Sequence, residues 1–187
     1  MRGKRALWGV LACLLLAGCA PHADEPEGLA LVRVLGVDGG GEVTLTAVCQ
    51  GPGQTEPLRG SVSGDDFSSA REQLPWAGER EMALTSLSYL IINEDVDLED
   101  VLTTILNDQE LSPAALVWYT GDAAALLAGC KDPLSRLEVL VERGQRAPTA
   151  AEALAELKTF GTVDLPVLVL SGETIEVKGM IRWEGSA

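Results

Sequence analysis

The sequence predicts an α/β fold (α+β-like) with a single mixed β-sheet, in which a central βαβ unit is flanked by helices. Two nearly continuous apolar runs, residues 87–93 and 114–119, are typical of strands that are buried on both faces. Between them Asp97 can cap a helix. The apolar stripe expected on that helix is Leu98, Val101, Leu102, Ile105 and Leu106. A strand, a helix and a second buried strand in this order predict a βαβ unit with parallel strands.

A β-hairpin is expected before this unit. Residues 29–37 predict a strand, residues 38–41 predict a glycine-rich turn, and residues 43–49 alternate apolar and polar side chains as a return strand does. The glycines can supply the positive φ angles that a tight turn requires.

The segment between the hairpin and the βαβ unit has weaker signals. Residues 51–64 are rich in Gly, Pro and Ser, which predicts a surface loop. A short helix is expected to start at Asp65 and to end at Pro75. We interpret residues 76–84 as a loop that leads into the first core strand.

Three helices are expected after the βαβ unit. The first spans residues 121–129, the second starts at Asp132 and ends at Gly144, and the third opens with the capping box of residues 149–152 and ends at Gly161. The side chains expected to face inward are Leu134, Leu137, Leu140 and Val141 in the second helix, and Ala153, Leu154, Leu157 and Phe160 in the third.

Two strands are expected to close the domain. Residues 165–170 form the first, and Pro166 favours a strand start or a sheet edge. Residues 171–173 predict a turn, and residues 174–183 form the second strand, in which Gly179 suggests a β-bulge. The predicted order of elements is therefore ββαβαβαααββ.

Residues 1–18 have the pattern of a bacterial lipoprotein signal peptide. Basic residues near the start precede an apolar stretch, residues 6–16, that is too short to span a bilayer. Leu16-Ala17-Gly18-Cys19 then resembles a lipobox, which predicts cleavage before Cys19 and attachment of lipid to its sulfur. Residues 19–28 are expected to form a flexible tether before a single domain, residues 29–187. The alternative is an ordinary secretory signal with an incidental cysteine.

Composition and charge limit the classes of molecule that the domain can bind. The chain has 187 residues, 47% of them hydrophobic, which is enough for one globular domain with a core. Cleavage before Cys19 would remove three of the 14 basic residues and none of the 28 acidic ones, so the exported, lipid-anchored chain would carry a net charge of −17. Such a domain is repelled by phosphate backbones and anionic lipid headgroups, which excludes nucleic-acid binding.

We expect no catalytic, metal or cofactor site, and therefore no enzyme. The single histidine, His22, falls in the expected tether, where it cannot join a Ser-His-Asp or Cys-His arrangement in the domain. Cys49 and Cys130 are too few for a zinc site, and they are either small buried side chains or a disulfide pair. Acidic residues are numerous, but no pair of them stands out by its spacing.

Three segments allow a ligand site as well as a structural role. We interpret glycines 39–41 as a turn rather than a phosphate loop. Thr120 and Gly121 end a core strand, where α/β sheets tend to bind ligands, but Asp122 favours a helix cap there. The oxygen-rich residues 93–100 allow a calcium loop, and a solvated loop with a helix start is favoured.

The order of these elements resembles the N-terminal domain of the spore-germination receptor C-subunit lipoproteins, the Ger(x)C family. The similar stretches are the opening hairpin (29–38 and 43–48), the short helix (67–74), the strand-helix-strand block (87–121) and the closing Leu-Pro strand with its hairpin (165–183). Two features differ from the family. Ala20-Pro21-His22 replaces its aromatic-acidic-basic segment, and its C-terminal domains have no counterpart in this sequence.

The resemblance implies a lipid-anchored, non-catalytic subunit or accessory protein of a spore nutrient-germinant receptor. Such a protein would lie on the outer leaflet of the spore inner membrane and would contact the A-type subunit and the permease-like B-type subunit. An alternative is a membrane-tethered lipoprotein that binds a small molecule in a cleft at the ends of the core strands.

Overall fold

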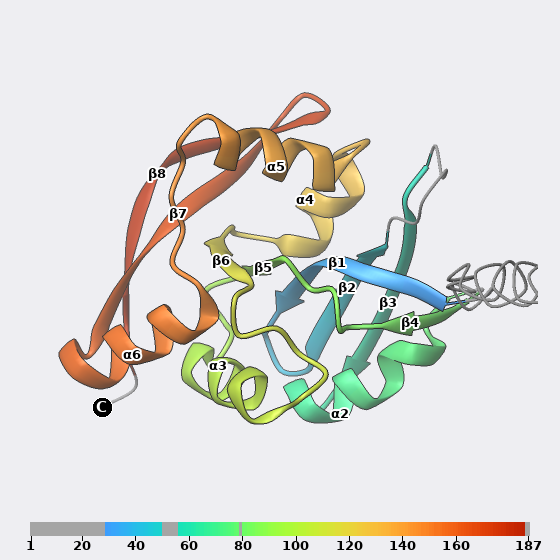
Figure 1. Cartoon of the computed structure of the whole chain (residues 1–187), viewed down its shortest axis with the longest axis horizontal. Helices are drawn as coiled ribbons and strands as arrows, with labels where there is room; N and C mark the ends of the chain where they lie inside the picture. Colours follow the sequence, from blue (N-terminus) through green and yellow to red (C-terminus); the bar gives the residue numbers. More distant parts are fainter. Residues whose placement is uncertain (1–28, 50–55, 79, 186–187) are drawn as a thin grey trace, which may run out of the picture.

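The structure, a computed structural model, describes residues 29–49, 56–78 and 80–185. Its eight strands form one mixed sheet in the order β3-β2-β1-β5-β6-β7-β8, and β4 pairs with β1 outside this path (Figure 1). The strands are β1 (Leu29–Asp38), β2 (Val43–Cys49), β3 (Leu58–Gly64), β4 (Glu81–Ala83), β5 (Tyr89–Ile92), β6 (Leu116–Tyr119), β7 (Thr162–Ser171) and β8 (Thr174–Glu184). The helices are α2 (Phe67–Gln73), the 3₁₀ helix η1 (Leu74–Trp76), α3 (Leu98–Asn107), α4 (Ala123–Gly129), α5 (Pro133–Glu142) and α6 (Ala150–Phe160).

The predicted fold class is confirmed, with the βαβ unit β5-α3-β6 at its centre. β5 pairs in parallel with β6 from Tyr89↔Leu116 to Ile92↔Tyr119, and on its other side it pairs in parallel with β1. Asp97 caps α3 by accepting a hydrogen bond from the backbone N–H of Asp100. Burial on both faces explains why the core strands have almost no polar side chains.

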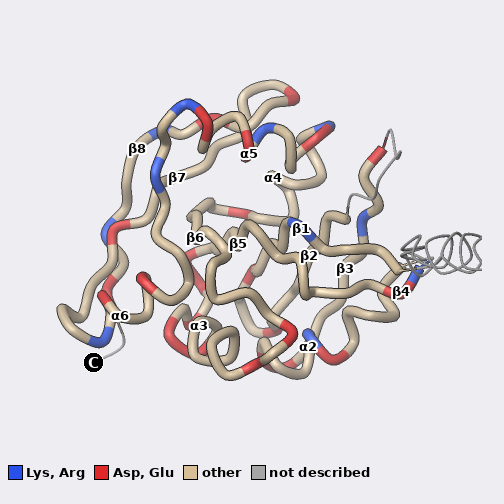
Figure 2. The backbone as a smooth tube through the Cα atoms, viewed as in Figure 1, with Lys and Arg blue, Asp and Glu red and all other residues tan. Residues whose placement is uncertain are grey.

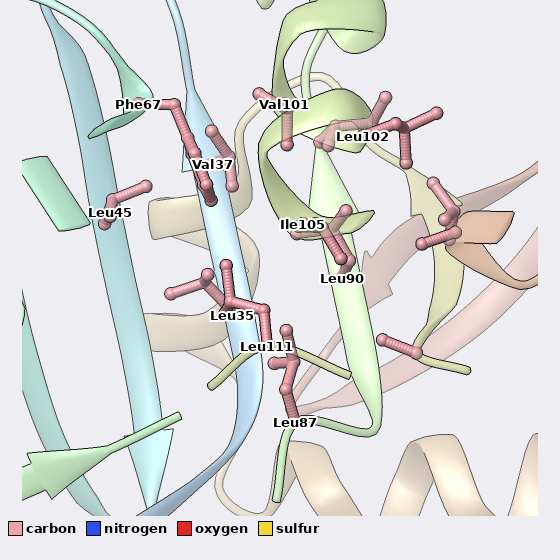
Figure 3. Close-up of a cluster of buried hydrophobic side chains, with 14 of the residues drawn as sticks. Leu35, Val37, Leu45, Phe67, Leu87, Leu90, Val101, Leu102, Ile105 and Leu111 are labelled. Atoms are coloured by element: carbon pink, nitrogen blue, oxygen red, sulfur yellow. The ribbon is translucent and has the colours of Figure 1, made fainter. Parts of the chain in front are cut away.

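Helices cover both faces of the sheet, so the domain has two hydrophobic clusters. The lower cluster in Figure 1 lies between the sheet and α2, α3 and α6, and the upper cluster lies between the sheet and α4 and α5. Figure 3 shows part of the lower cluster, where Ile105 of α3 lies beside Leu90 of β5, and Val101 and Leu102 lie on the preceding turn of the same helix. These α3 side chains are at most 2% exposed, so most of the predicted stripe forms this core.

The structure adds two strands that the sequence interpretation lacked. β3 lies within residues 51–64 and β4 within residues 76–84, both of which were predicted as loops, so the predicted element order was incomplete there. β3 has little intrinsic strand preference because glycine and serine make up most of it. Its full pairing with β2, from Val43↔Gly64 to Cys49↔Leu58, outweighs that weak preference.

Three apolar side chains that were expected to face inward are exposed. Leu106 is 41% exposed, Val141 is 36% exposed and Phe160 is 73% exposed. Each belongs to the last turn of its helix. The N-caps of these helices are as predicted, including the capping box at Thr149, and the left-handed Gly161 caps the end of α6, whereas the C-cap of α5 is Arg143 and the predicted Gly144 follows it.

The β7–β8 hairpin contains the predicted bulge. Val167 pairs with Gly179 but Leu168 pairs with Val177, so Lys178 is an extra residue in β8. Val177 packs against the upper cluster, whereas Ile181 and Trp183 pack against the lower cluster. Because one residue is inserted between them, odd-numbered side chains change faces at the bulge.

Candidate functional site

The predicted lipid-attachment residue Cys19 and the single histidine His22 lie outside the described residues. The two cysteines of the domain are both free and buried. Cys49 belongs to the lower cluster and Cys130 to the upper cluster, so the sheet separates them and they do not form a disulfide. Burial raises the pKa of the Cys49 thiol to about 11 and also raises the pKa of Cys130.

The strands β1, β5 and β6 end at one side of the sheet, which we call the carboxyl edge. This is the place where α/β sheets tend to bind ligands, frequently at a helix N-terminus. Asp38, the last residue of β1, fills that position at α4. Its carboxylate accepts hydrogen bonds from the backbone N–H groups of Ala123 at 2.7 Å and Ala124 at 2.8 Å.

Asp122 completes the cap, as the sequence predicted, by accepting from the N–H of Ala125 at 2.7 Å. Two carboxylates thus take up the free N–H groups that a phosphate would need. Burial raises the pKa of Asp38, although the two backbone hydrogen bonds lower it. Asp38 was predicted only as part of a turn, and its position at the end of a buried strand was the available signal for its capping role.

The turn after β1 and the loop after β5 are joined by Asn93. Its side-chain oxygen accepts from the N–H of Gly39 at 2.9 Å and from the N–H of Asp95 at 3.3 Å. A Cβ atom on Gly39 would lie 2.2 Å from the carbonyl oxygen of Asp95, so only glycine fits. In the segment weighed as a calcium loop, the side chains of Asn93 and Asp97 therefore accept hydrogen bonds from the backbone.

A hollow of about 440 Å³ opens beside the loop between β5 and α3, and we call it the acidic hollow. Its apolar lining includes Leu98 of α3, Leu157 of α6, and Ile181 and Trp183 of β8. The Trp183 ring packs edge-on against Tyr119 of β6, with ring centroids 6.2 Å apart and an interplanar angle of 63°. The hollow thus has an aromatic wall that is fixed by the core.

Carboxylates form the rim of the acidic hollow: Glu94, Asp97, Glu99 and Glu184. Among the described residues, Lys158 forms an ion pair with Glu99, and Arg182 forms one with Asp164. The other three rim carboxylates form no ion pair in the described part of the chain, although Arg182, which also lines the hollow, is near enough to Glu184 for a coulombic interaction. Figure 2 shows how widely acidic positions are spread over the domain, which agrees with the charge of the sequence. An apolar group that carries a positive charge is the chemical complement of this hollow.

A larger hollow of about 700 Å³ lies where α4 ends and α5 begins. Its lining includes three acidic residues and three basic ones, Arg59, Lys131 and Arg136, and Arg59 donates a hydrogen bond to the carbonyl of Cys130 at 2.7 Å. Because its charges are balanced and its lining is polar, this hollow selects less clearly for one kind of ligand than the acidic hollow does.

Comparison with known proteins adds no relative: no family model, no curated protein and no solved structure matches the chain. The resemblance to the Ger(x)C family therefore stays a prediction. The described residues include no helix that is long and apolar enough to cross a membrane. They also include no group of three metal-ligating side chains.

Proposed function

We propose that this protein is a lipid-anchored, non-catalytic subunit or accessory protein of a spore nutrient-germinant receptor, which acts through protein–protein contacts. Its partners would be the A-type and permease-like B-type membrane subunits. Its location would be the outer leaflet of the spore inner membrane, reached by export and lipid attachment at Cys19.

The observation that carries the contact role is the acidic hollow. It combines an aromatic wall with a rim of carboxylates, three of which form no ion pair among the described residues. Buried aromatic side chains and complementary charges are the features that position a partner and speed its encounter. The capped helix α4 supports the same reading, because Asp38 occupies the place where a phosphate-bearing substrate would bind.

The anchor is tested by replacing Cys19 with alanine. We expect the wild-type chain in the membrane fraction and the Cys19→Ala variant outside it, because one short apolar signal cannot replace two or more acyl chains. Metabolic labelling with a clickable fatty acid should mark only the wild-type chain. A variant that stays fully in the membrane fraction would refute the anchor.

The receptor role is tested by deletion and by co-purification. In spores that lack close paralogues, we expect deletion to slow germination by nutrients while germination by a receptor-independent trigger is unchanged. Normal germination by nutrients in the deletion spores would refute the proposal. The tagged protein should also co-purify with the A-type and B-type subunits from spore membranes.

A matched pair of variants tests the hollow as the contact site. Glu94→Gln with Glu184→Gln removes two rim charges without touching a helix cap. Glu156→Gln with Glu176→Gln removes two exposed charges from α6 and β8 elsewhere, so it controls for net charge. Co-purification should fall with the rim pair only, and an equal fall with both pairs would point to non-specific electrostatics.

A second candidate function, binding of a small molecule, is favoured by the size of the acidic hollow. Its volume of about 440 Å³ lies within the usual range of ligand pockets. The expected ligand is a small amine or amino acid with an apolar side chain. Such compounds should raise the melting temperature of the wild-type chain but not that of the double variant Glu94→Gln with Glu184→Gln, and this result would support the function. No shift of the wild-type melting temperature at millimolar concentrations would count against it.

A further inference from the structure

One exposed aromatic side chain lies far from the acidic hollow. Trp76 is 77% exposed, whereas its helical neighbour Leu74 is fully buried, so the core fixes the backbone while the indole stands outside. Of the other tryptophans in the described residues, Trp118 is fully buried and Trp183 is partly covered by Tyr119. Nothing in the packing of η1 requires a tryptophan at this position.

The surface next to Trp76 is hollowed, and the following residue, Ala77, lines the hollow. A hollow of about 500 Å³ is lined by the apolar residues Ala30, Pro57, Leu58, Ala77 and Met82. Arg80 and Arg59 also line it, the guanidinium of Arg59 being bound to the carbonyl of Cys130, and Glu81 is exposed after Arg80 in the sequence. We call Trp76 and this hollow the entry surface.

The chain enters the domain at this surface. Ala30 lines the hollow, and the first residue of β1, Leu29, pairs with Glu81 of β4. Cys19 precedes Leu29 by ten residues, and ten extended residues span at most about 35 Å. A lipid on Cys19 would therefore keep the entry surface within reach of the bilayer.

We propose that Trp76 inserts its ring at the headgroup level of the bilayer to which the chain is anchored. This inference rests on the proposed lipid attachment at Cys19. Tryptophan favours this level because its ring is apolar and its N–H can bond to polar groups. Arginine stems can lie along the apolar surface while their guanidinium groups contact lipid phosphates.

The bilayer that fits best is zwitterionic. The charged residues that line the entry surface are arginines, but the net charge of the mature chain is strongly negative, so anionic lipids would repel the domain as a whole. Insertion at this surface would orient the domain. Figure 1 shows the start of β1 and the helix α6 at opposite ends of the long axis, so α6 and the nearby acidic hollow would face away from the lipid.

The experiment uses the lipidated mature chain in phosphatidylcholine vesicles whose acyl chains carry bromine, a short-range quencher of tryptophan emission. We expect strong quenching of the wild-type chain relative to unbrominated vesicles. Trp76→Phe should abolish most of that quenching, because Trp118 is buried in the domain. Trp183→Phe should leave it unchanged.

A relocated tryptophan supplies the matched control. Phe160 is 73% exposed at the end of α6, nearly the same as Trp76. In the double variant Trp76→Phe with Phe160→Trp, the new tryptophan should be quenched by aqueous iodide but not by brominated lipid. Circular dichroism and the emission of Trp118 would verify that each variant is folded.

The outcomes separate this inference from the anchor. If the wild-type chain floats with the vesicles but is not quenched, the anchor stands and the inference is overturned. Equal quenching at positions 76 and 160 would also overturn it, since the domain would then have no fixed orientation. Emission that shifts only when receptor subunits are added would assign the entry surface to a protein partner instead. A chain that does not float refutes the anchor and, with it, this inference.

Discussion

Replacing Asp38 with alanine is the sharpest test of the hydrogen bonds that join β1 to α4 at the carboxyl edge. The carboxylate of Asp38 binds two backbone N–H groups across 85 and 86 residues of sequence, those of Ala123 and Ala124. Alanine at this position leaves both N–H groups at the start of α4 without their partner. The substitution also removes a half-buried charge, and this part of the effect is favourable.

The expected loss of stability is about 2 kcal/mol. An unpaired buried N–H costs roughly 1–3 kcal/mol, and loss of a helix cap costs roughly 0.5–2 kcal/mol. Two N–H groups are affected, but water can reach part of the site and the buried charge is relieved, which keeps the sum near the middle of these ranges. With an urea m-value of about 2 kcal/mol/M, the unfolding midpoint should fall by about 1 M.

Asp122→Ala is the matched control, because Asp122 caps the same helix through one exposed N–H. Its loss should cost about 1 kcal/mol or less. If Asp38→Ala is no more destabilising than Asp122→Ala in urea titrations, Asp38 does not fasten β1 to α4 and the reasoning is wrong.

The pH dependence supplies a second check on Asp38. Its pKa is raised in the folded chain, so protonation favours the folded state as the pH falls through that pKa. The Asp38→Ala variant has no carboxyl group at this position and therefore does not gain stability in this way. The stability difference between wild type and variant should therefore widen when the pH is lowered from 7 towards 4. A difference that narrows would mean that the hydrogen bonds outweigh burial and that the pKa is lowered.

Three further contrasts test the packing. In urea titrations, Gly39→Ala should lower the free energy of unfolding by about 2 kcal/mol or more, because the added Cβ meets the carbonyl of the β5–α3 loop. Gly121→Ala should change it by no more than about 0.5 kcal/mol, because a Cβ there meets nothing within 4 Å. Equal effects of the two substitutions would show that Gly39 does not closely approach this loop. Ile105→Ala should lower the free energy of unfolding by roughly 2–5 kcal/mol because Ile105 is buried, and Leu106→Ala should lower it by less than about 1 kcal/mol because Leu106 is partly exposed. The reverse order of these two effects would mean that α3 is rotated about its axis. The Cys49 thiol, with its pKa of about 11, should react with a disulfide reagent at pH 8 only after unfolding, and rapid labelling of Cys49 itself in the native chain would show that β2 opens.

The elements that the sequence predicts well are those with local chemical signals. Asp97 before α3 and Thr149 before α6 each take a backbone hydrogen bond within three residues, so the cap can be recognised from the sequence alone. The apolar runs of β5 and β6 are equally plain, because burial on both faces leaves no room for alternation.

The elements that were missed depend on distant partners. β3 is specified by its pairing with β2, including a hydrogen bond between the hydroxyls of Thr44 and Ser63, and its own residues carry no strand signal. The acidic hollow is built from α3, α6 and β8, so no single stretch of sequence contains it. The role of Asp38 likewise depends on α4, which follows it by about 85 residues.

The bulge at Lys178 has a consequence for how the domain unfolds. Because β8 changes faces there, one continuous strand contributes side chains to both hydrophobic clusters, Val177 to the upper and Trp183 to the lower. Neither cluster can lose the hairpin without exposing apolar surface in the other. The hairpin therefore couples the two halves of the domain thermodynamically, and they are expected to melt in a single cooperative transition.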